Sequence, residues 1–176
     1  MTSLILPPAL LWATVSDLLY RKIHNRLVLT LLMLWLGALL LALPGSVSAS
    51  DVLVDAAWAL PGALAVLVVG FGLFRLGRVG AGDVKLMTVL CLWLGASNQA
   101  TFIILTSLVG GLLALLLPLL SLFERMLALT WWGLVQHLPR TPPLPQCLGD
   151  IPLPGIPYAA AIAVGALGTL FIPIHS

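Results

Sequence analysis

Hydrophobic residues are grouped in long runs along the chain, and short polar breaks separate one run from the next. An α-helix needs about 20 residues to cross the hydrocarbon core of a bilayer, and runs close to that length occur repeatedly. No stretch alternates polar and apolar residues for long enough to form a barrel strand. The pattern predicts an all-α, polytopic membrane protein with about six transmembrane helices: Leu4–Leu19, Leu27–Leu43, Val52–Phe74, Val84–Ala96, Thr101–Leu120 and Pro157–Ile174.

The composition indicates that lipid is the main solvent of this chain. Of the 176 residues, 61% are hydrophobic and only 8% are charged, whereas soluble domains carry roughly 25% charged residues. A net charge of +2, with no long basic run, gives no support for a nucleic-acid partner. Cys91 and Cys147 stand alone in different settings, so we expect neither a disulfide framework nor a metal site, and no cofactor.

The basic residues predict the orientation in the membrane, because cytoplasmic loops carry an excess of Lys and Arg. In a six-helix layout, all Lys and Arg residues fall in the loops after the first, third and fifth helices, which we expect to be cytoplasmic. Both termini are then expected outside. No basic residue precedes the first apolar run, so it is expected to be a retained helix. The basic residues are Arg21, Lys22, Arg26, Arg75, Arg78, Lys85, Arg125 and Arg140.

The long connection before the last helix, residues 121–156, differs from the others. Its first part, Leu122–His137, is apolar and aromatic, and its Trp131-Trp132 pair is typical of the headgroup region. We predict a helix lying in the interface there, and an irregular, proline-rich strap over Leu138–Ile156. The alternative is a tolerated loop without a function. The whole chain, 1–176, is expected to be a single membrane-embedded domain containing this cytoplasmic or interfacial loop.

Two of the acidic residues stand at the cytoplasmic ends of apolar segments. Asp17 lies in the last turn of the first predicted helix, and Asp83 immediately precedes the fourth. Ionisable groups at such depth are costly and usually mark a function or a charge pair. Because the predicted topology brings both to one face of the membrane, they can meet. The other acidic residues are expected to be solvated or favoured by a helix dipole: Asp51, Asp55, Glu124 and Asp150.

A close pair of aspartates supports acid–base catalysis. Like charges disfavour double ionisation, so the pKa of one carboxyl rises and the pair shares a proton. The ionised carboxylate can activate water, while the protonated one polarises a carbonyl and later protonates a leaving amine. The expected reaction is peptide hydrolysis without a metal or a covalent intermediate. Gly80 and Gly82 would let the backbone turn sharply beside Asp83 and approach an extended substrate.

A structural interpretation of the same residues stays open at this point. Asp83 follows a glycine and precedes an apolar run, which is the pattern of a helix N-cap. Asp17 can form an ion pair with Arg21, four residues later. Lys85 fits an interfacial side chain whose ammonium reaches the headgroups, or a residue that tunes Asp83.

The motif around Asp83 resembles a known family. Gly80–Asp83 matches the Gly-x-Gly-Asp signature of polytopic aspartic proteases, and the longer run Gly80–Leu86 resembles the Gly-x-Gly-Asp-x-Lys-Leu motif of the type IV prepilin peptidase family. The sequence Trp93-Leu94-Gly95 that follows is also similar to the family's pattern. The signature is weak alone, but two further matches lie in the same order along the chain.

The first of these is Ser16–Arg26, which resembles the family's first motif: an aspartate at a helix end, a basic turn and Ile-Pro-Asn. Asn25 takes the asparagine position, whereas His24 replaces the proline, and we interpret His24 as an interfacial loop residue rather than a ligand. The second is Pro157-Tyr158 before a helix rich in small residues, which resembles the Pro-Tyr or Pro-Phe of the family.

The resemblance implies a membrane aspartic endopeptidase of the bacterial inner membrane. It cuts the short basic leader from prepilin or pseudopilin precursors at the cytoplasmic face. Larger members carry an insertion with two Cys-x-x-Cys pairs that is linked to N-methylation. This sequence resembles the small, peptidase-only branch that serves tight-adherence (Flp-type) pili. The implied catalytic pair is Asp17 and Asp83, and the implied loop-shaping or substrate-binding residues are Gly80, Gly82, Lys85, Asn25, Pro157 and Tyr158.

Functions of other classes fit parts of the same sequence. A proton-coupled transporter would use intramembrane aspartates as a relay, but it predicts similar halves and acidic groups near the midplane. A membrane acyltransferase would favour a Ser, His or Lys over two carboxylates. A catalytically silent pilus-assembly protein would keep the same motifs. The sequence leaves the oligomeric state and the particular precursor open.

Overall fold

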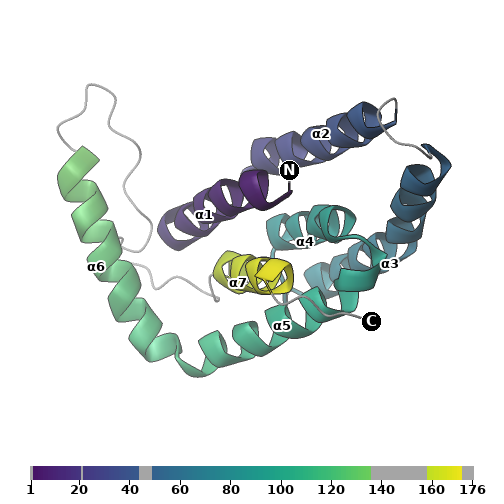
Figure 1. Cartoon of the computed structure of the whole chain (residues 1–176). Helices are drawn as coiled ribbons and strands as arrows, with labels where there is room; N and C mark the ends of the chain where they lie inside the picture. Colours follow the sequence, from purple (N-terminus) through teal and green to yellow (C-terminus); the bar gives the residue numbers. More distant parts are fainter. Residues whose placement is uncertain (1, 21, 44–48, 136–157, 172–176) are drawn as a thin grey trace.

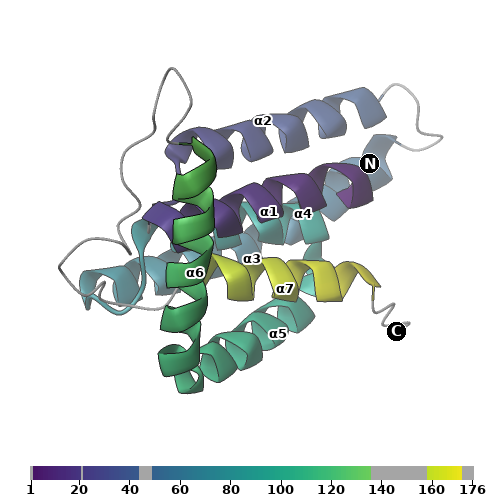
Figure 2. The same cartoon turned by 90° about the vertical axis from the view of Figure 1, so that its left-hand side faces the viewer.

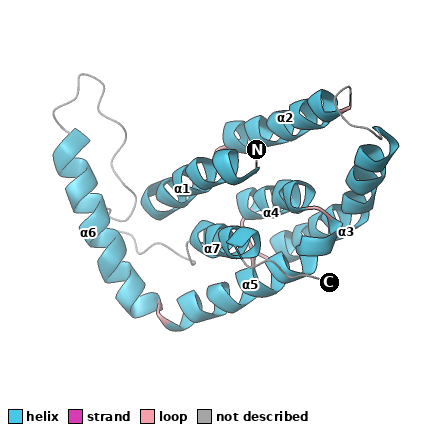
Figure 3. Ribbon diagram, in the orientation of Figure 1, coloured by secondary structure: helices cyan, strands magenta, loops and turns pink. Residues whose placement is uncertain are grey.

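The structure, a computed structural model, is all-helical over the residues that it describes: 2–20, 22–43, 49–135 and 158–171. No strand occurs in these ranges (Figure 3), so the predicted all-α membrane fold is confirmed. The helices, labelled in Figure 1, are α1 Thr2–Tyr20, α2 Asn25–Ala42, α3 Ala49–Arg75, α4 Ala81–Leu94, α5 Ala96–Leu115, α6 Leu117–Val135 and α7 Tyr158–Phe171.

Three of these helices, α2, α3 and α5, are long and apolar enough to cross a membrane, and α1 and α7 contain shorter apolar helices, at Ile5–Tyr20 and Tyr158–Leu170. Their outward surfaces carry large apolar side chains, such as Trp58 and Val68 of α3. Such a surface is expected where the solvent is hydrocarbon, because lipid imposes no penalty on exposed leucine, valine or phenylalanine.

The arrangement is a bundle with one crossing helix. Figures 1 and 2 show α1, α2, α4, α5 and α7 running lengthwise, with α6 standing across the end where α1 ends and α2, α4 and α7 begin. The N-terminal end of α1 and the C-terminal end of α7 lie at the opposite end. The helix α4 packs against α2, α3, α5 and α7. Because α4 begins at the end where α1 ends and α2 and α7 begin, its first turn lies near these helix ends (Figures 1 and 2).

The predicted fifth helix, Thr101–Leu120, is wrong at its C-terminal end. The helix α5 stops at Leu115, and α6 begins at Leu117. The break, at Leu116, lies two residues before Pro118. Proline has no N–H and disfavours the continuation of a helix, but it is tolerated in the first turn of a new one. Residues from 121 to Val135 are therefore helical rather than loop, as predicted for Leu122–His137. Residues 136–157, including the predicted strap and Pro157, lie outside the described part.

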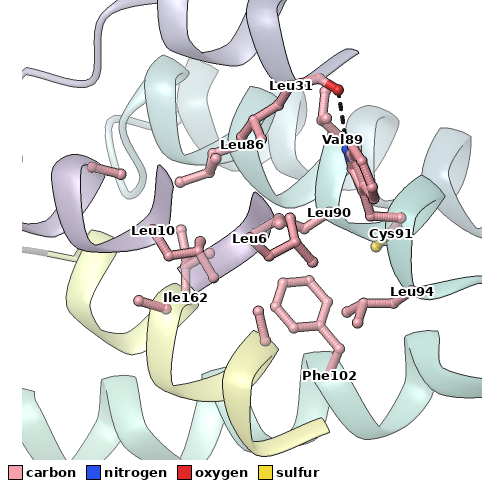
Figure 4. Close-up of a cluster of buried hydrophobic side chains, with 14 of the residues drawn as sticks. Leu6, Leu10, Leu31, Leu86, Val89, Leu90, Cys91, Leu94, Phe102 and Ile162 are labelled. Atoms are coloured by element: carbon pink, nitrogen blue, oxygen red, sulfur yellow. Dashed lines mark hydrogen bonds between the residues drawn. The ribbon is translucent and has the colours of Figure 1, made fainter. Parts of the chain in front are cut away.

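Close helix contacts depend on small residues, as in many membrane bundles. A side chain added at Gly165 of α7 would lie 2.9 Å from the backbone nitrogen of Thr106 in α5, and one at Gly110 would lie 2.8 Å from the hydroxyl oxygen of Tyr158. Apolar side chains from α1, α4, α5 and α7 then meet in one core around Phe102 (Figure 4).

Two indole donors fix α4 in this core. Trp93 Nε1 donates to the backbone carbonyl of Leu31, and Trp35 Nε1 donates to that of Leu92, both at 3.0 Å; Figure 4 draws the first bond. Both tie α2 to α4. Between α4 and α5, Gly95 has φ +74°, a conformation that favours glycine, and it alone joins the two helices.

Candidate active site

The carboxylate of Asp17 is buried, with 7% of the residue exposed. It lies in the last turn of α1, where the helix dipole disfavours a negative charge. The N-terminus of α7 compensates, because the backbone N–H of Ala159 donates to Asp17 Oδ2 at 3.1 Å. This N–H is one of the donors that every helix start leaves without an intrahelical partner. Asp17 and Ala159 are 142 residues apart in sequence, and their hydrogen bond stabilises a negative charge that the end of α1 disfavours.

The second carboxylate, Asp83, lies in the first turn of α4, ahead of the apolar segment Val84–Ala96. It folds back to accept a hydrogen bond from the backbone N–H of Gly80, the N-cap residue of the same helix. This contact is half of a capping box. The interpretation of Asp83 as the N-cap is therefore wrong: Gly80 is the N-cap, and Asp83 caps the helix start from the third helical position.

The two aspartates line one pocket of about 300 Å³, together with Lys22–His24 and Gly80–Gly82. Burial is the main cause that raises the pKa of Asp83 to about 7, and the charge of Asp17 raises it further, while the Gly80 N–H acts in the opposite direction. The predicted meeting of the two aspartates is thus seen in the structure. Near neutral pH, such a pair can hold one proton and one negative charge.

The glycines beside Asp83 are needed because a side chain would not fit there, and not because they form the predicted sharp turn. Gly80 has φ −72° and ψ 142°, which any residue can adopt, and Gly82 lies within α4. A side chain at Gly80 would come within 2.7 Å of Asp83 Oδ2, and one at Gly82 within 2.9 Å of the Cβ of Ile23. Gly80 therefore makes room for the Asp83 carboxylate, and Gly82 lets α4 pack against the α1–α2 link.

Ser16 holds that link in place. Its hydroxyl donates to the backbone carbonyl of Lys22 at 2.8 Å and lies 3.3 Å from Nδ1 of His24. Because the single hydroxyl proton goes to Lys22, Ser16 accepts from the imidazole, and Nδ1 carries the ring proton. His24 precedes α2 with φ −70° and ψ 127°, a φ close to that of proline. This similarity explains how histidine fits where the family motif has proline.

Lys85, Asn25 and Tyr158 are not among the residues that line the pocket, and Pro157 lies outside the described part of the chain. Lys85 Nζ donates to Asn25 Oδ1 at 3.1 Å, and this bond joins the first turns of α4 and α2. Tyr158 begins α7 and packs against Gly110, next to the N–H that holds Asp17. Among the described residues, no three His, Cys, Asp or Glu side chains gather closely enough to hold a metal ion.

Sequence reasoning missed Ser16 and the Ala159 N–H. Ser16 directly precedes Asp17, and its proximity to a candidate carboxylate was the one signal that could have selected it. The role of Ala159 depends on where α7 begins and on how close α1 approaches it, and no local sequence pattern records either fact.

A match to a known protein family covers more than half of the chain. A family model described as the type IV leader peptidase family matches residues 4–115. The matched range contains both aspartates, the α1–α2 link and the Gly80–Asp83 turn. No curated protein and no solved structure matches the chain.

Proposed function

The chain belongs to the type IV leader peptidase family, and from this we propose that it is an aspartic endopeptidase of the bacterial inner membrane. Its proposed substrates are prepilin or pseudopilin precursors, from which it removes a short basic leader. The observation that carries the proposal is the single pocket lined by Asp17 and Asp83. Two carboxylates from separate helices, with one pKa near 7, provide the acid and the base that peptide hydrolysis requires.

The environments of the two aspartates support a division of roles. Asp17, which accepts the α7 N–H, is the ionised base, and Asp83, with its raised pKa, is the protonated acid. Asp17 takes a proton from water as the water oxygen attacks the scissile carbonyl carbon, while Asp83 gives its proton to the carbonyl oxygen. When the tetrahedral intermediate collapses, Asp17 protonates the leaving amine and a hydroxyl proton returns to Asp83. Both groups then regain their starting states.

The proposed orientation places this pocket at the cytoplasmic face, with both termini outside. Five of the described basic residues lie at the pocket end of the bundle, on the α1–α2 link, the α3–α4 link or the adjoining helix turns. The positive-inside tendency favours this end for the cytoplasm. The crossing direction of α6 at the same end (Figure 2) fits a helix in the interface. The five residues are Lys22, Arg26, Arg75, Arg78 and Lys85.

Co-expression with a panel of prepilin-like precursors tests the proposal. We expect one or more precursors to lose the leader, seen as a gel shift, and mass spectrometry of the new N-terminus to locate the cut. A panel that stays intact in the presence of correctly inserted protein would refute the proposed activity. Loss of the leader at the same rate without this chain would refute it as well.

A further inference from the structure

A second, larger cavity lies between α1 and α2. It measures about 660 Å³, and most of the residues that line it are apolar. Trp12 of α1 and Leu34 of α2 contribute to its walls, and both side chains are substantially exposed. Large apolar side chains on two neighbouring membrane helices thus leave a groove between them rather than closing against each other.

The polar residues of this groove are concentrated at one end. His24 and Arg26 belong to the α1–α2 link and the first turn of α2, and Thr30 lies one turn further along. The Thr30 hydroxyl donates to the backbone carbonyl of Arg26 at 2.8 Å, so it is already satisfied within its own helix. Beyond this end, the groove offers packing surface and few hydrogen-bond partners.

One residue connects this groove with the catalytic pocket. His24 lines both cavities, and among the residues that the structure describes no other does. Ser16 and the Lys22 carbonyl hold the link that carries it. A polypeptide that follows the groove toward its polar end therefore reaches the pocket of Asp17 and Asp83 by passing His24.

Resting on the proposed function, we propose that the α1–α2 groove binds the apolar helix of the polypeptide being cut, and that His24 sets which peptide bond reaches the two aspartates. In lipid, helices associate through close packing and a few polar contacts rather than through the hydrophobic effect. A groove with apolar walls provides the packing, and its polar end provides a fixed stopping point. The substrate must leave the helical conformation beyond His24, because the pocket of about 300 Å³ accepts an extended segment.

The first experiment fills the groove. Thr30→Trp places a large side chain on its exposed α2 wall without touching the aspartates, and Val68→Trp, on the exposed surface of α3, is the matched control. Each variant is assayed with a precursor that contains a basic leader and an apolar helix, and with a peptide that ends a few residues after the cut. We expect Thr30→Trp to cause at least a roughly tenfold larger loss of kcat/KM for the precursor than for the peptide, and Val68→Trp to change neither.

If Thr30→Trp cuts both substrates at the wild-type rate, the groove holds only lipid. If Thr30→Trp loses the same fraction of kcat/KM on both substrates, the groove is part of the catalytic scaffold. Either result overturns the proposal. A wild-type protein that cuts neither substrate would instead refute the proposed function, so a measurement without turnover is also needed.

Photo-crosslinking supplies that measurement. A photoreactive residue at Trp12, in an otherwise inactive Asp17→Asn background, is expected to crosslink to the apolar helix of the precursor, whereas the same residue at Trp58 of α3 is not. Both positions are similarly exposed, so lipid contact is matched. Equal labelling from the two positions, or labelling of lipid alone, would contradict the proposal.

The role of His24 is tested by the position of the cut. We expect His24→Ala to yield products that are cut at neighbouring bonds. We expect His24→Pro, which keeps the backbone φ, to restore the amount of folded protein but not the single cleavage position. A single, unchanged cleavage position in both variants would show that His24 only holds the link.

Discussion

Two pockets of similar volume lie at opposite ends of the bundle, and an aspartate lines each. The pocket at the α1–α2 link measures about 300 Å³ and is lined by Asp17 and Asp83. The pocket at the other end measures about 330 Å³ and is lined by Asp55 of α3, with residues of α2 and the C-terminal end of α4. The helix α4 therefore contributes to both, through its first turn in one and its last turn in the other.

The difference lies in what surrounds each carboxylate. Asp55 is exposed, and no other acidic residue of the described part of the chain lines its pocket. Asp17 is buried and held by the start of α7, and Asp83 is held by the start of its own helix. Helix starts supply backbone N–H donors that keep a carboxylate in place. Of these two pockets, the one at the α1–α2 link is the candidate catalytic site, because helix ends there hold two carboxylates.

The largest effect is expected from removing either charge of the pair. Asp17→Asn and Asp83→Asn should each lower precursor cleavage by about 10²–10⁴-fold, the contribution typical of a positioned acid or base. The amide keeps the shape of the side chain, so membrane insertion should persist, and it is checked by the amount of protein extracted from membranes. Asp55→Asn is the matched control at the other pocket and should leave cleavage unchanged. Activity of either pocket variant at the wild-type level would remove the pair from the mechanism.

A smaller effect is expected from displacing one carboxylate without removing it. The methyl group of Gly80→Ala would come within 2.7 Å of Asp83 Oδ2 and push the carboxylate from its place. A shift of about 1 Å at a reacting group can reduce the rate on the order of 10²-fold. Gly72→Ala in α3 meets nothing within 4 Å and should be neutral. If both alanine variants cleave the precursor equally well, Gly80 does not position Asp83.

These two predictions also show what local sequence could establish. The apolar runs located the helices, and the Gly80–Leu86 motif located Asp83, because both are patterns of neighbouring residues. The end of α5 was misplaced because four leucines lie within the next five residues and obscure the break near Pro118. The contacts that position Asp17, by contrast, involve helices far apart in sequence. The purpose of Gly80 was visible only once Asp83 was seen to fold back over it.

The dependence of cleavage on pH distinguishes the roles of the two carboxyls. The proposed mechanism needs Asp83 protonated, and its pKa is raised to about 7. Activity should therefore decline as the pH rises through about 7, by about tenfold per unit well above that value. The measurement is kcat/KM for the precursor in vesicles across neutral pH, with membrane insertion followed in parallel. A flat profile through this range would mean that Asp83 does not supply the proton.

The smallest effect is expected at the rim of the pocket, where Lys85 donates to Asn25. Both side chains are exposed, and a typical protein hydrogen bond contributes only about 1 kcal/mol net to stability. Lys85→Met removes the donor but keeps the apolar stem, and it should lower thermal stability slightly and cleavage by only a few fold, on the order of that energy. Asn25→Ala should have the same effect, and the double variant no more than either single one, because the two residues share one bond. A loss as large as that of Asp83→Asn would instead place Lys85 among the groups that contact substrate. The contrast between a pocket that depends on its carboxylates and a rim that merely joins α2 to α4 would then be wrong.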